Sequence, residues 1–406
     1  MNAWDVLQER GFVEQVSDEE GLRKALERPL TFYIGYDPTA SSLHTGHLLT
    51  AMAVTHLQRA GHRPIIIIGG GTGMIGDPTG RTEMRQMLTA EAIDENLQAI
   101  KTQMSRFVPF GEGQALALNN ADWLMKLGYI PFLRDIGQHF SVNRMLAAEA
   151  YRQRLERGLS FIELNYQILQ AYDFLHLYRE HGCTLQLGGN DQWGNILAGV
   201  DLIRRVEGAE VYAMTFPLLT TASGAKMGKT AAGTVWVDAE LTSPFDYYQY
   251  WINVEDADVA RFLKLYTFMP LDEIAELTRF EGAKLRPAKE VLAYEATKVA
   301  HGQQAAQEAR EASKALFAGG GDTDAVPAIE VKQGELAGGI PAVELFDRTG
   351  LCRSRSEARR LIQQGGAYIN DAPVDDVDRE ITANDLHEGE ILLRAGKKRY
   401  HRVVVV

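Results

Sequence analysis

One stretch near the start of the chain, residues 33–47, joins three kinds of local signal. Its first residues are apolar enough for a short buried strand, and the Pro, Thr and Ser residues that follow indicate a loop. Apolar residues then recur at helical spacing from Gly46 onward, which places His44 and His47 at a helix N-terminus after a strand. Such a junction offers unpaired backbone N–H groups and a positive dipole end, both of which favour a phosphate group.

The two histidines allow two interpretations. They are either surface residues that cap a helix, or imidazole donors in a nucleotide triphosphate site. Gly46 between them is compatible with the second interpretation, because a residue without a side chain lets a bulky planar group approach the backbone closely.

A second polar segment carries Lys226 and Lys229 in a run of small residues that predicts an exposed, mobile loop. Alone, two lysines in such a loop are readily explained as solvated charge. Together, the sequences HTGH at residues 44–47 and KMGKT at residues 226–230 resemble the HIGH and KMSKS signatures of class I aminoacyl-tRNA synthetases. Their order and their separation also fit. The match is inexact, because Thr45 replaces an isoleucine, and a glycine and a threonine replace the two serines.

A glycine-rich turn, residues 69–80, follows the apolar strand expected at residues 65–68. Its glycines have the G-x-G-x-x-G spacing of a dinucleotide fingerprint. However, Asp77 and Pro78 interrupt the helix that this fingerprint requires, and the helix expected at residues 89–106 leaves no second strand to supply a ribose-binding acid. A phosphate-binding P-loop is also disfavoured, since no Gly-Lys-Ser/Thr follows. We therefore expect the backbone to approach a small ligand here, with Asp77 as its charged anchor.

Strands alternate with helices through the first half of the chain, which predicts an α/β fold with a doubly wound, Rossmann-like parallel sheet and its site at the switch point. A strand at residues 185–187 leads into a glycine turn with polar side chains and a further helix, as the first motif does. The helix expected at residues 160–180 places Tyr166, Gln170 and Asp173 on one face. That polar face is either solvated or turned inward.

Composition restricts the class of protein further. The 406 residues suffice for two or three domains, and no apolar run approaches the roughly 18 residues of a membrane span. The N-terminus lacks a signal pattern, and Cys183 and Cys352 are too few and too far apart to indicate a disulfide framework or a zinc site. The net charge of −12 argues against a general nucleic-acid coat, but basic clusters at 353–360 and 394–402 allow RNA binding at a defined place. These features predict a cytoplasmic protein.

Changes in composition along the chain indicate separate domains. We expect a catalytic domain at 1–233 with a helical insertion at about 90–180 and the lysine loop at 220–233, a helical domain at 234–317, a flexible linker at 318–340 and a small α+β domain at 341–406. The linker prediction depends on a high content of Gly, Asp and Ala. Insertions like the helical one often supply a dimer contact.

Beyond the two signatures, the chain resembles bacterial tyrosyl-tRNA synthetases over essentially its whole length. The segments that carry this resemblance are 33–47, 71–85, 166–174 and 187–195. The last domain, with SEARRLI at 356–362 and YIN at 368–370, resembles the small RNA-binding domain of that family, which is shared with a ribosomal protein.

The resemblance implies an enzyme that activates L-tyrosine with ATP to tyrosyl-adenylate and pyrophosphate, then transfers tyrosyl to the terminal adenosine of tRNA(Tyr). It also implies a homodimer, the use of Mg2+, anticodon recognition by the helical domain, and no DNA or membrane partner. No metal site formed by protein ligands is expected.

The resemblance also assigns residues to these substrates. The implied tyrosine contacts are Tyr33 and Asp173 at the phenol, then Asp77, Tyr166, Gln170 and Gln192. The implied ATP contacts are Gly35, Asp37, Thr39, His44, His47, Gly189, Asp191 and Lys229. The residues expected to act on the phosphates during catalysis are His44, His47, Lys226, Lys229, Thr230, Arg81 and Arg85.

Two alternatives stay open at this point. One is a related adenylate-forming enzyme for tryptophan, which would need an indole pocket without paired phenol partners. The other is an RNA-binding protein that keeps the fold and the last domain but lacks catalysis. The presence of both histidines and both lysines argues against the second alternative.

Overall fold

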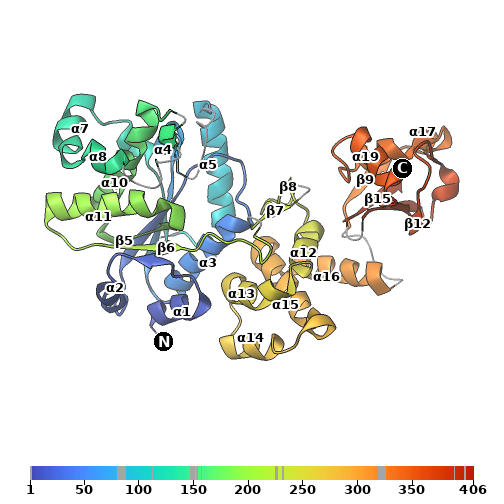
Figure 1. The fold of residues 1–406 in the computed structure, drawn as a ribbon, viewed down its shortest axis with the longest axis horizontal. Helices are drawn as coiled ribbons and strands as arrows, with labels where there is room; N and C mark the ends of the chain where they lie inside the picture. The colour runs from blue at the N-terminus through green and yellow to red at the C-terminus, as the bar shows by residue number, and fades with distance from the viewer. Residues whose placement is uncertain are drawn as a thin grey trace. The chain divides into compact units, whose positions relative to one another are not determined.

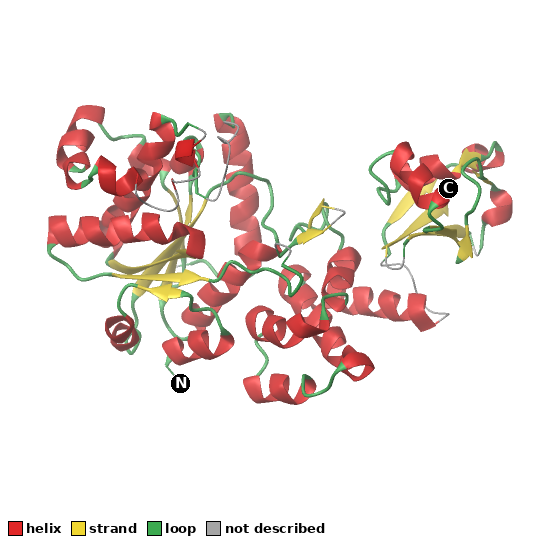
Figure 2. Cartoon of the chain, viewed as in Figure 1, coloured by secondary structure: helices red, strands yellow, loops and turns green. Residues whose placement is uncertain are grey.

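The computed structural model describes most of the chain (Figures 1 and 2). The described residues are 2–79, 88–111, 113–146, 151, 154–156, 158–224, 227–230, 233–318, 326–387, 389–396 and 399–406. The chain divides into two compact units. The first comprises Met1–Asp238 and Glu255–Ala288, and the second comprises Ala239–Val254 and Lys289–Val406.

A six-stranded sheet forms the centre of the first unit (Figure 2). Its strands, in spatial order, are β1 (Gln15–Val16), β6 (Tyr212–Phe216), β5 (Cys183–Gly189), β2 (Thr31–Tyr36), β3 (Arg63–Ile68) and β4 (Leu116–Asn119). β1 pairs antiparallel with β6, and the other neighbouring strands are parallel. The chain runs from β2 through β3 to β4 and then returns to β5 and β6 on the other side of β2. This order confirms the doubly wound α/β prediction and puts the switch point between β2 and β5.

Helices cover both faces of this sheet. The larger helices of the first unit are α1 (Ala3–Arg10), α2 (Glu19–Ala25), α3 (Thr45–Arg59), α5 (Ala90–Met104), α7 (Tyr129–Asp135), α10 (Phe161–His181), α11 (Trp193–Glu207), α13 (Asp256–Tyr266) and α14 (Leu271–Leu277). Tyr33, Ile65 and Ile67 share an apolar cluster with α10 and α11, whereas α3 and α5 also contact β3. Ile66 and Ile68 alternate with these residues along β3 and are also at most 1% exposed, so the strand is buried on both faces, as its sequence predicts.

Helix α10 begins and ends at signals present in its sequence. The Ser160 side chain accepts from the Glu163 backbone N–H, and the Glu163 carboxylate accepts from the Ser160 backbone N–H, which forms a capping box. The helix ends at Gly182, whose φ of 61° is left-handed. Its polar face is turned inward, since Tyr166 and Asp173 are only 6% and 3% exposed. Of the two alternatives that the sequence left open, a solvated face and an inward face, the structure has the inward one.

The region expected to form one helical domain, residues 234–317, is helical but is divided between the two units. α13 and α14 belong to the first unit, α12 and α16 belong to the second, and α15 belongs to the second from Lys289 onward. Arg10 explains why α13 and the residues after it belong to the first unit. Its guanidinium donates to three backbone oxygens between Lys264 and Met269 at 2.6–3.0 Å. These bonds tie the end of α13 to α1.

Two other expectations need correction in the first unit. The helical insertion at 90–180 also contains β4, which extends the main sheet by pairing with β3. The lysine loop at 220–233, expected to be exposed and mobile, contains a short hairpin of β7 (Lys229–Thr230) and β8 (Gly233–Thr234). Met227 before the hairpin is 6% exposed, so this part of the loop is packed.

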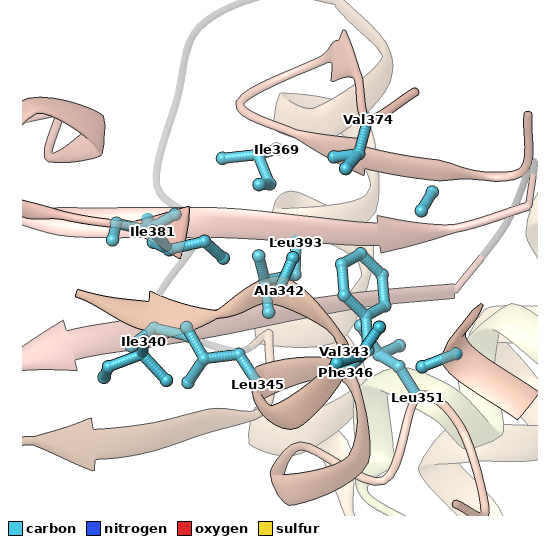
Figure 3. Packing of buried hydrophobic residues seen from close by; sticks show 14 of the residues in the cluster. Ile340, Ala342, Val343, Leu345, Phe346, Leu351, Ile369, Val374, Ile381 and Leu393 are labelled. Carbon is cyan, nitrogen blue, oxygen red and sulfur yellow. The ribbon is translucent and has the colours of Figure 1, made fainter. Parts of the chain in front are cut away.

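The second unit joins helices to a small mixed sheet. Its helices are α12 (Pro244–Ile252), α15 (Arg286–His301), α16 (Gln303–Ala318), α17 (Gln333–Ala337), α18 (Ala342–Arg348) and α19 (Arg355–Gln363). A five-stranded sheet has the order β12 (Ala372–Pro373), β11 (Ala367–Ile369), β14 (Glu390–Ala395), β15 (Arg399–Val405) and β9 (Ala328–Val331). β10 (Ile340–Pro341) pairs separately with β13 (Glu380–Ile381). Figure 3 shows Phe346, Leu345 and Leu393 among the apolar side chains that form the core of this part.

Part of the predicted linker, residues 318–340, is instead regular structure. β9 pairs in parallel with β15, and Val331 and Leu336 lie in the apolar core at 1% and 0% exposure. The small domain therefore begins by residue 326 rather than at 341. The sequence did not reveal β9, because a four-residue edge strand is too short to show a period. The high content of Gly, Asp and Ala in this stretch suggested a linker instead. Across the described part of the chain, no helix is long and apolar enough to span a bilayer.

Candidate active site

A cavity of about 1210 Å³ lies at the carboxyl ends of β2 and β5, at the switch point of the sheet. The predicted site residues that line it are Tyr33, Gly35, Asp37, Thr39, His44, His47, Asp77, Tyr166, Gln170, Asp173, Gly189, Asp191 and Gln192. Residues from well-separated segments thus meet in one hollow. The backbone of Lys229 and Thr230 forms β7, while Lys226, Arg81 and Arg85 lie outside the described residues.

His44 and His47 cap helix α3 with their own side chains. The Gly46 N–H donates to His44 Nδ1 at 3.0 Å, and the His44 N–H donates to His47 Nδ1 at 3.3 Å. A ring nitrogen that accepts a hydrogen bond carries no proton, so the proton of each imidazole lies on Nε2. The rings stack at 3.9 Å between centroids. The pair therefore forms the helix cap, as the first interpretation predicts, and its Nε2–H groups are compatible with the second.

Gly46 makes room for a ring of the protein itself. A Cβ at this position would lie 2.8 Å from His44 Cε1 and 3.0 Å from His44 Nδ1. The planar group that approaches the Gly46 backbone is therefore the His44 ring itself. A glycine is required here so that the ring can fold back onto the first turn of α3.

One end of the cavity is a buried polar pocket. Asp173 accepts hydrogen bonds from Trp123 Nε1 at 2.7 Å and from Asn120 Nδ2 at 2.9 Å. Burial raises the pKa of Asp173 to about 7, although these two hydrogen bonds lower it. Burial, and then the charge of Asp173, raise the pKa of Tyr33 well above its usual value, so this phenol stays protonated. The Tyr33 hydroxyl and Gln186 Oε1 are buried with no hydrogen-bond partner among the described residues, which marks a place for a polar ligand group.

Two further carboxylates line the same cavity. Asp77 accepts from Gln192 Nε2 at 2.6 Å and is 7% exposed. Asp37 accepts from the Tyr166 hydroxyl and from Thr72 Oγ1, each at 2.8 Å. The expected tyrosine contact Tyr166 is therefore bonded to the expected nucleotide contact Asp37, so the two parts of the cavity are continuous.

Several residues of the site were not predicted from the sequence. Asn120 and Trp123 follow β4, a strand that the sequence did not reveal, and Thr72 and Gln186 also line or support the polar end. The two asparagines at residues 119–120 were the available signal for these site residues, because polar side chains at the carboxyl end of a parallel strand lie near the ligand site. Trp236 also lines the cavity, with its ring 6.3 Å from that of His44.

The comparisons with known proteins agree with this geometry. The family described as tRNA synthetases class I (W and Y) matches residues 24–318, and the tyrosine–tRNA ligase SYY-like C-terminal domain matches residues 321–403. The chain is 55% identical to a tyrosine–tRNA ligase of Desulfosudis oleivorans, covering 100% of this chain and 99% of the relative. It is 54% identical to one of Acetivibrio thermocellus, with 100% of both covered. A C-terminally truncated mitochondrial tyrosyl-tRNA synthetase of Aspergillus nidulans has a TM-score of 0.71 at 30% identity, covering 78% of this chain and 94% of that one.

A doubly wound sheet with a histidine-capped helix at its switch point defines a class I tRNA synthetase fold. Full-length identity then places the chain within one branch of that class. The chain belongs to the tyrosine–tRNA ligase family, whose members use ATP as a substrate, and it is an enzyme that charges tRNA with tyrosine. The tryptophan and non-catalytic alternatives are thereby set aside.

Proposed function

We propose that the cavity binds L-tyrosine at its Asp173 end and ATP at its histidine end, so that tyrosyl-adenylate forms between them. The observation that carries this proposal is the continuity of the cavity from the buried Tyr33 hydroxyl, past Asp37, to the two imidazole donors. Tyrosine activation needs these two chemistries side by side: a polar pocket for a phenol and N–H donors for a triphosphate.

In this proposal the phenol hydroxyl donates to the Asp173 carboxylate and accepts from the Tyr33 hydroxyl. Asn120 and Trp123 hold the carboxylate in place, which makes them positioning residues. Both partners of the phenol are buried, so a substrate without a hydroxyl leaves the Tyr33 hydroxyl unpaired and deprives Asp173 of one hydrogen bond. The substrate amino group would lie among Asp77, Tyr166 and Gln170, and its carboxylate near Gln192.

At the other end, the Nε2–H groups of His44 and His47 would donate to phosphate oxygens. Gly35 supplies a flat floor, because it is exposed to the cavity and a Cβ there would meet nothing within 4 Å among the described atoms. Asp37, Thr39, Gly189 and Asp191 would surround the nucleoside part of ATP. The lysines of the hairpin segment and Arg81 and Arg85 would supply positive charge to the phosphates.

The chemistry requires no protein nucleophile. The tyrosine carboxylate attacks the α-phosphorus in line, the bond to the bridging oxygen breaks, and pyrophosphate leaves. The terminal ribose hydroxyl of the tRNA then attacks the adenylate carbonyl, and AMP leaves. The protein contributes position and stabilisation of negative charge on the phosphoryl oxygens, through His44, His47, Lys226, Lys229 and Thr230.

Mg2+ fits this proposal as an ion carried by the triphosphate. Among the described residues, no group of three or more His, Cys, Asp or Glu side chains could hold a metal ion. Mg2+ commonly binds through substrate phosphates with few protein ligands, and it would supply charge neutralisation there. The described residues are therefore compatible with an ion that is held by the substrate phosphates.

Amino-acid-dependent exchange of labelled pyrophosphate into ATP tests the assignment of the cavity. We expect exchange with tyrosine and background rates with tryptophan or phenylalanine, because only tyrosine presents a hydroxyl to both buried partners. Equal exchange with tyrosine and phenylalanine, or no exchange with tyrosine, would contradict the assignment of the Asp173 end of the cavity to the phenol.

We also propose a homodimer built on residues 116–161, which are part of the insertion at about 90–180. Seven of the eleven large apolar side chains that are exposed in the described chain lie in this segment. They are Leu116, Met125, Tyr129, Ile130, Val142, Leu155 and Phe161, with exposures of 40–69%. A concentration of exposed apolar residues in one segment is typical of a protein interface.

The homodimer makes a testable prediction at Ile130, which is 69% exposed on α7. Replacing Ile130 by aspartate should shift the sedimenting species from a dimer to a 45.1 kDa monomer, because a charge would be buried without a partner. Leu241→Asp is the matched control, since Leu241 is 51% exposed outside the segment and should leave the dimer intact. A wild-type protein that sediments as a monomer would contradict the proposal.

The small domain from residue 326 onward is proposed to bind tRNA. Arg359 and Arg360 are exposed on α19, and the Arg394 guanidinium lies 3.6 Å from the centre of the Tyr368 ring. Such basic and aromatic groups suit an RNA backbone and its bases. Because the protein charges tRNA, we also propose that it acts in the cytoplasm.

A further inference from the structure

Two residues that depart from the class I signatures lie against each other in the structure. Thr45 replaces the isoleucine of the first signature and Gly228 a serine of the second. Both are buried, and Thr45 is 0% exposed. A Cβ at Gly228 would overlap Thr45 Oγ1 and would lie 3.5 Å from Thr45 Cβ and 3.7 Å from the Gly46 nitrogen. The Gly228 backbone therefore packs directly on the Thr45 side chain.

This contact lies where residues 235–237, which follow the hairpin, are hydrogen-bonded to residues 43–45 at the start of α3. The Thr45 N–H donates to the Val235 oxygen at 3.2 Å, and the Val237 N–H donates to the Leu43 oxygen at 2.8 Å. The Val235 N–H in turn donates to the Gly228 oxygen at 2.8 Å. Gly228 is thus held between its own hairpin and the first turn of α3.

The conformation of Gly228 and the shape of Thr45 make this packing specific. Gly228 has a φ of +77°, a left-handed conformation that favours glycine. Thr45 is β-branched, so its side chain has few alternative rotamers by which to move away. Its Oγ1 has no hydrogen-bond partner among the described residues, so steric contact rather than a hydrogen bond fills this space.

We propose that Thr45 and Gly228 are positioning residues, which set the distance between the hairpin and the histidine pair and thereby fix the place of the Lys229 backbone beside the cavity. Lys229 follows Gly228 directly and begins β7, so a displacement of Gly228 moves the backbone from which this lysine projects. The proposal rests on the proposed function of the cavity and adds two determinants of the activation step that supply neither a charge nor a side-chain hydrogen bond to a substrate.

Gly228→Ala in the full-length protein tests the contact. We expect kcat for tyrosine-dependent pyrophosphate exchange to fall by about 10-fold or more, because small displacements of charged groups cost that much. The Kd for tyrosine should stay unchanged, since the phenol pocket is untouched, and this also shows that the variant is folded. Gly224→Ala is the matched control: Gly224 has a similar φ of +84° in the same loop, but a Cβ there meets nothing within 4 Å. Gly224→Ala should lower kcat by less than about twofold. The comparison therefore separates the effect of backbone strain from the effect of the contact with Thr45.

Second-site changes at Thr45 complete the experiment. Thr45→Ala combined with Gly228→Ala should restore most of kcat, because the remaining Cβ–Cβ distance of 3.5 Å is an ordinary contact. Thr45→Val with Gly228→Ala should not restore it, since a methyl group then occupies the place of Oγ1. Equal losses for Gly228→Ala and Gly224→Ala, or equal rescue by alanine and valine, would overturn the proposal. A wild-type protein without tyrosine-dependent exchange would instead refute the function of the cavity.

Discussion

Replacing Asp173 by alanine is expected to lower kcat/KM for tyrosine by roughly 10- to 100-fold, the effect of losing a hydrogen bond to a charged group. The value for phenylalanine should hardly change, because phenylalanine has no hydroxyl to present to the carboxylate. The preference for tyrosine therefore narrows by a similar factor. Pyrophosphate exchange with each amino acid on one preparation measures both values.

The surroundings of Asp173 supply the control for this experiment. Asp122 lies on α6 (Ala121–Leu124), between Asn120 and Trp123, but is exposed. Asp122→Ala should therefore leave both values of kcat/KM unchanged. The wild-type preference is expected to be about 10⁵, a magnitude known for the tyrosine enzymes and not obtained from this structure. An unchanged preference in the Asp173 variant would remove this carboxylate from the phenol.

The pH dependence offers an independent readout of the same group. Burial raises the pKa of Asp173 to about 7 in the free protein, so the carboxyl takes up a proton as the pH falls below that value. We expect kcat/KM for tyrosine to decrease below pH 7, and Asp173→Asn to abolish this decrease. The effect of pH on the free energy of unfolding has the opposite sign. Between pH 3.8 and about 7, Asp173 keeps its proton in the folded protein but has lost it in the unfolded chain. The free energy of unfolding therefore decreases as the pH rises through that range.

A chain that ends at Ala318 is expected to activate tyrosine at nearly the wild-type rate and to charge tRNA at least about 10²-fold more slowly, because the basic residues proposed to contact tRNA phosphates are gone. A cut at Gly339 would be a poorer test, since β9 and α17 would remain with Val331 and Leu336 stripped of their core. The C-terminally truncated Aspergillus nidulans enzyme matches 78% of this chain at 30% identity. Phe245 and Ala312 lose their packing with Val326 and Tyr400, so we expect a lower unfolding temperature.

A full-length variant separates charge from folding in this experiment. Arg359→Ala with Arg360→Ala keeps the domain core and removes two exposed positive charges of α19. It should weaken tRNA binding and reduce its salt dependence, with exchange of pyrophosphate unaffected. Exchange and charging are measured in one buffer for all proteins. Charging at the full rate by the truncated chain would show that the domain does not bind tRNA.

Much of the fold and the site could be predicted from the sequence because the signals are local. A run of four isoleucines indicates a strand buried on both faces, and the Ser160 capping box marks the start of α10. The histidines at the start of α3 and the i, i+4, i+7 spacing of Tyr166, Gln170 and Asp173 likewise depend only on near neighbours. Thirteen residues assigned by resemblance then lie in one cavity, since parallel strands bring their carboxyl ends to one edge.

The tertiary structure alone decided those features that depend on residues far apart in the chain. β4 and β9 are four-residue strands whose pairing partners, β3 and β15, lie about 50 and 70 residues away, so no local period reveals them. Asn120 and Trp123 become supports of Asp173 only because β4 joins the main sheet. Thr45 and Gly228 meet only because the hairpin folds back onto α3. Sequence patterns encode which face of an element is buried, whereas packing decides what it is buried against.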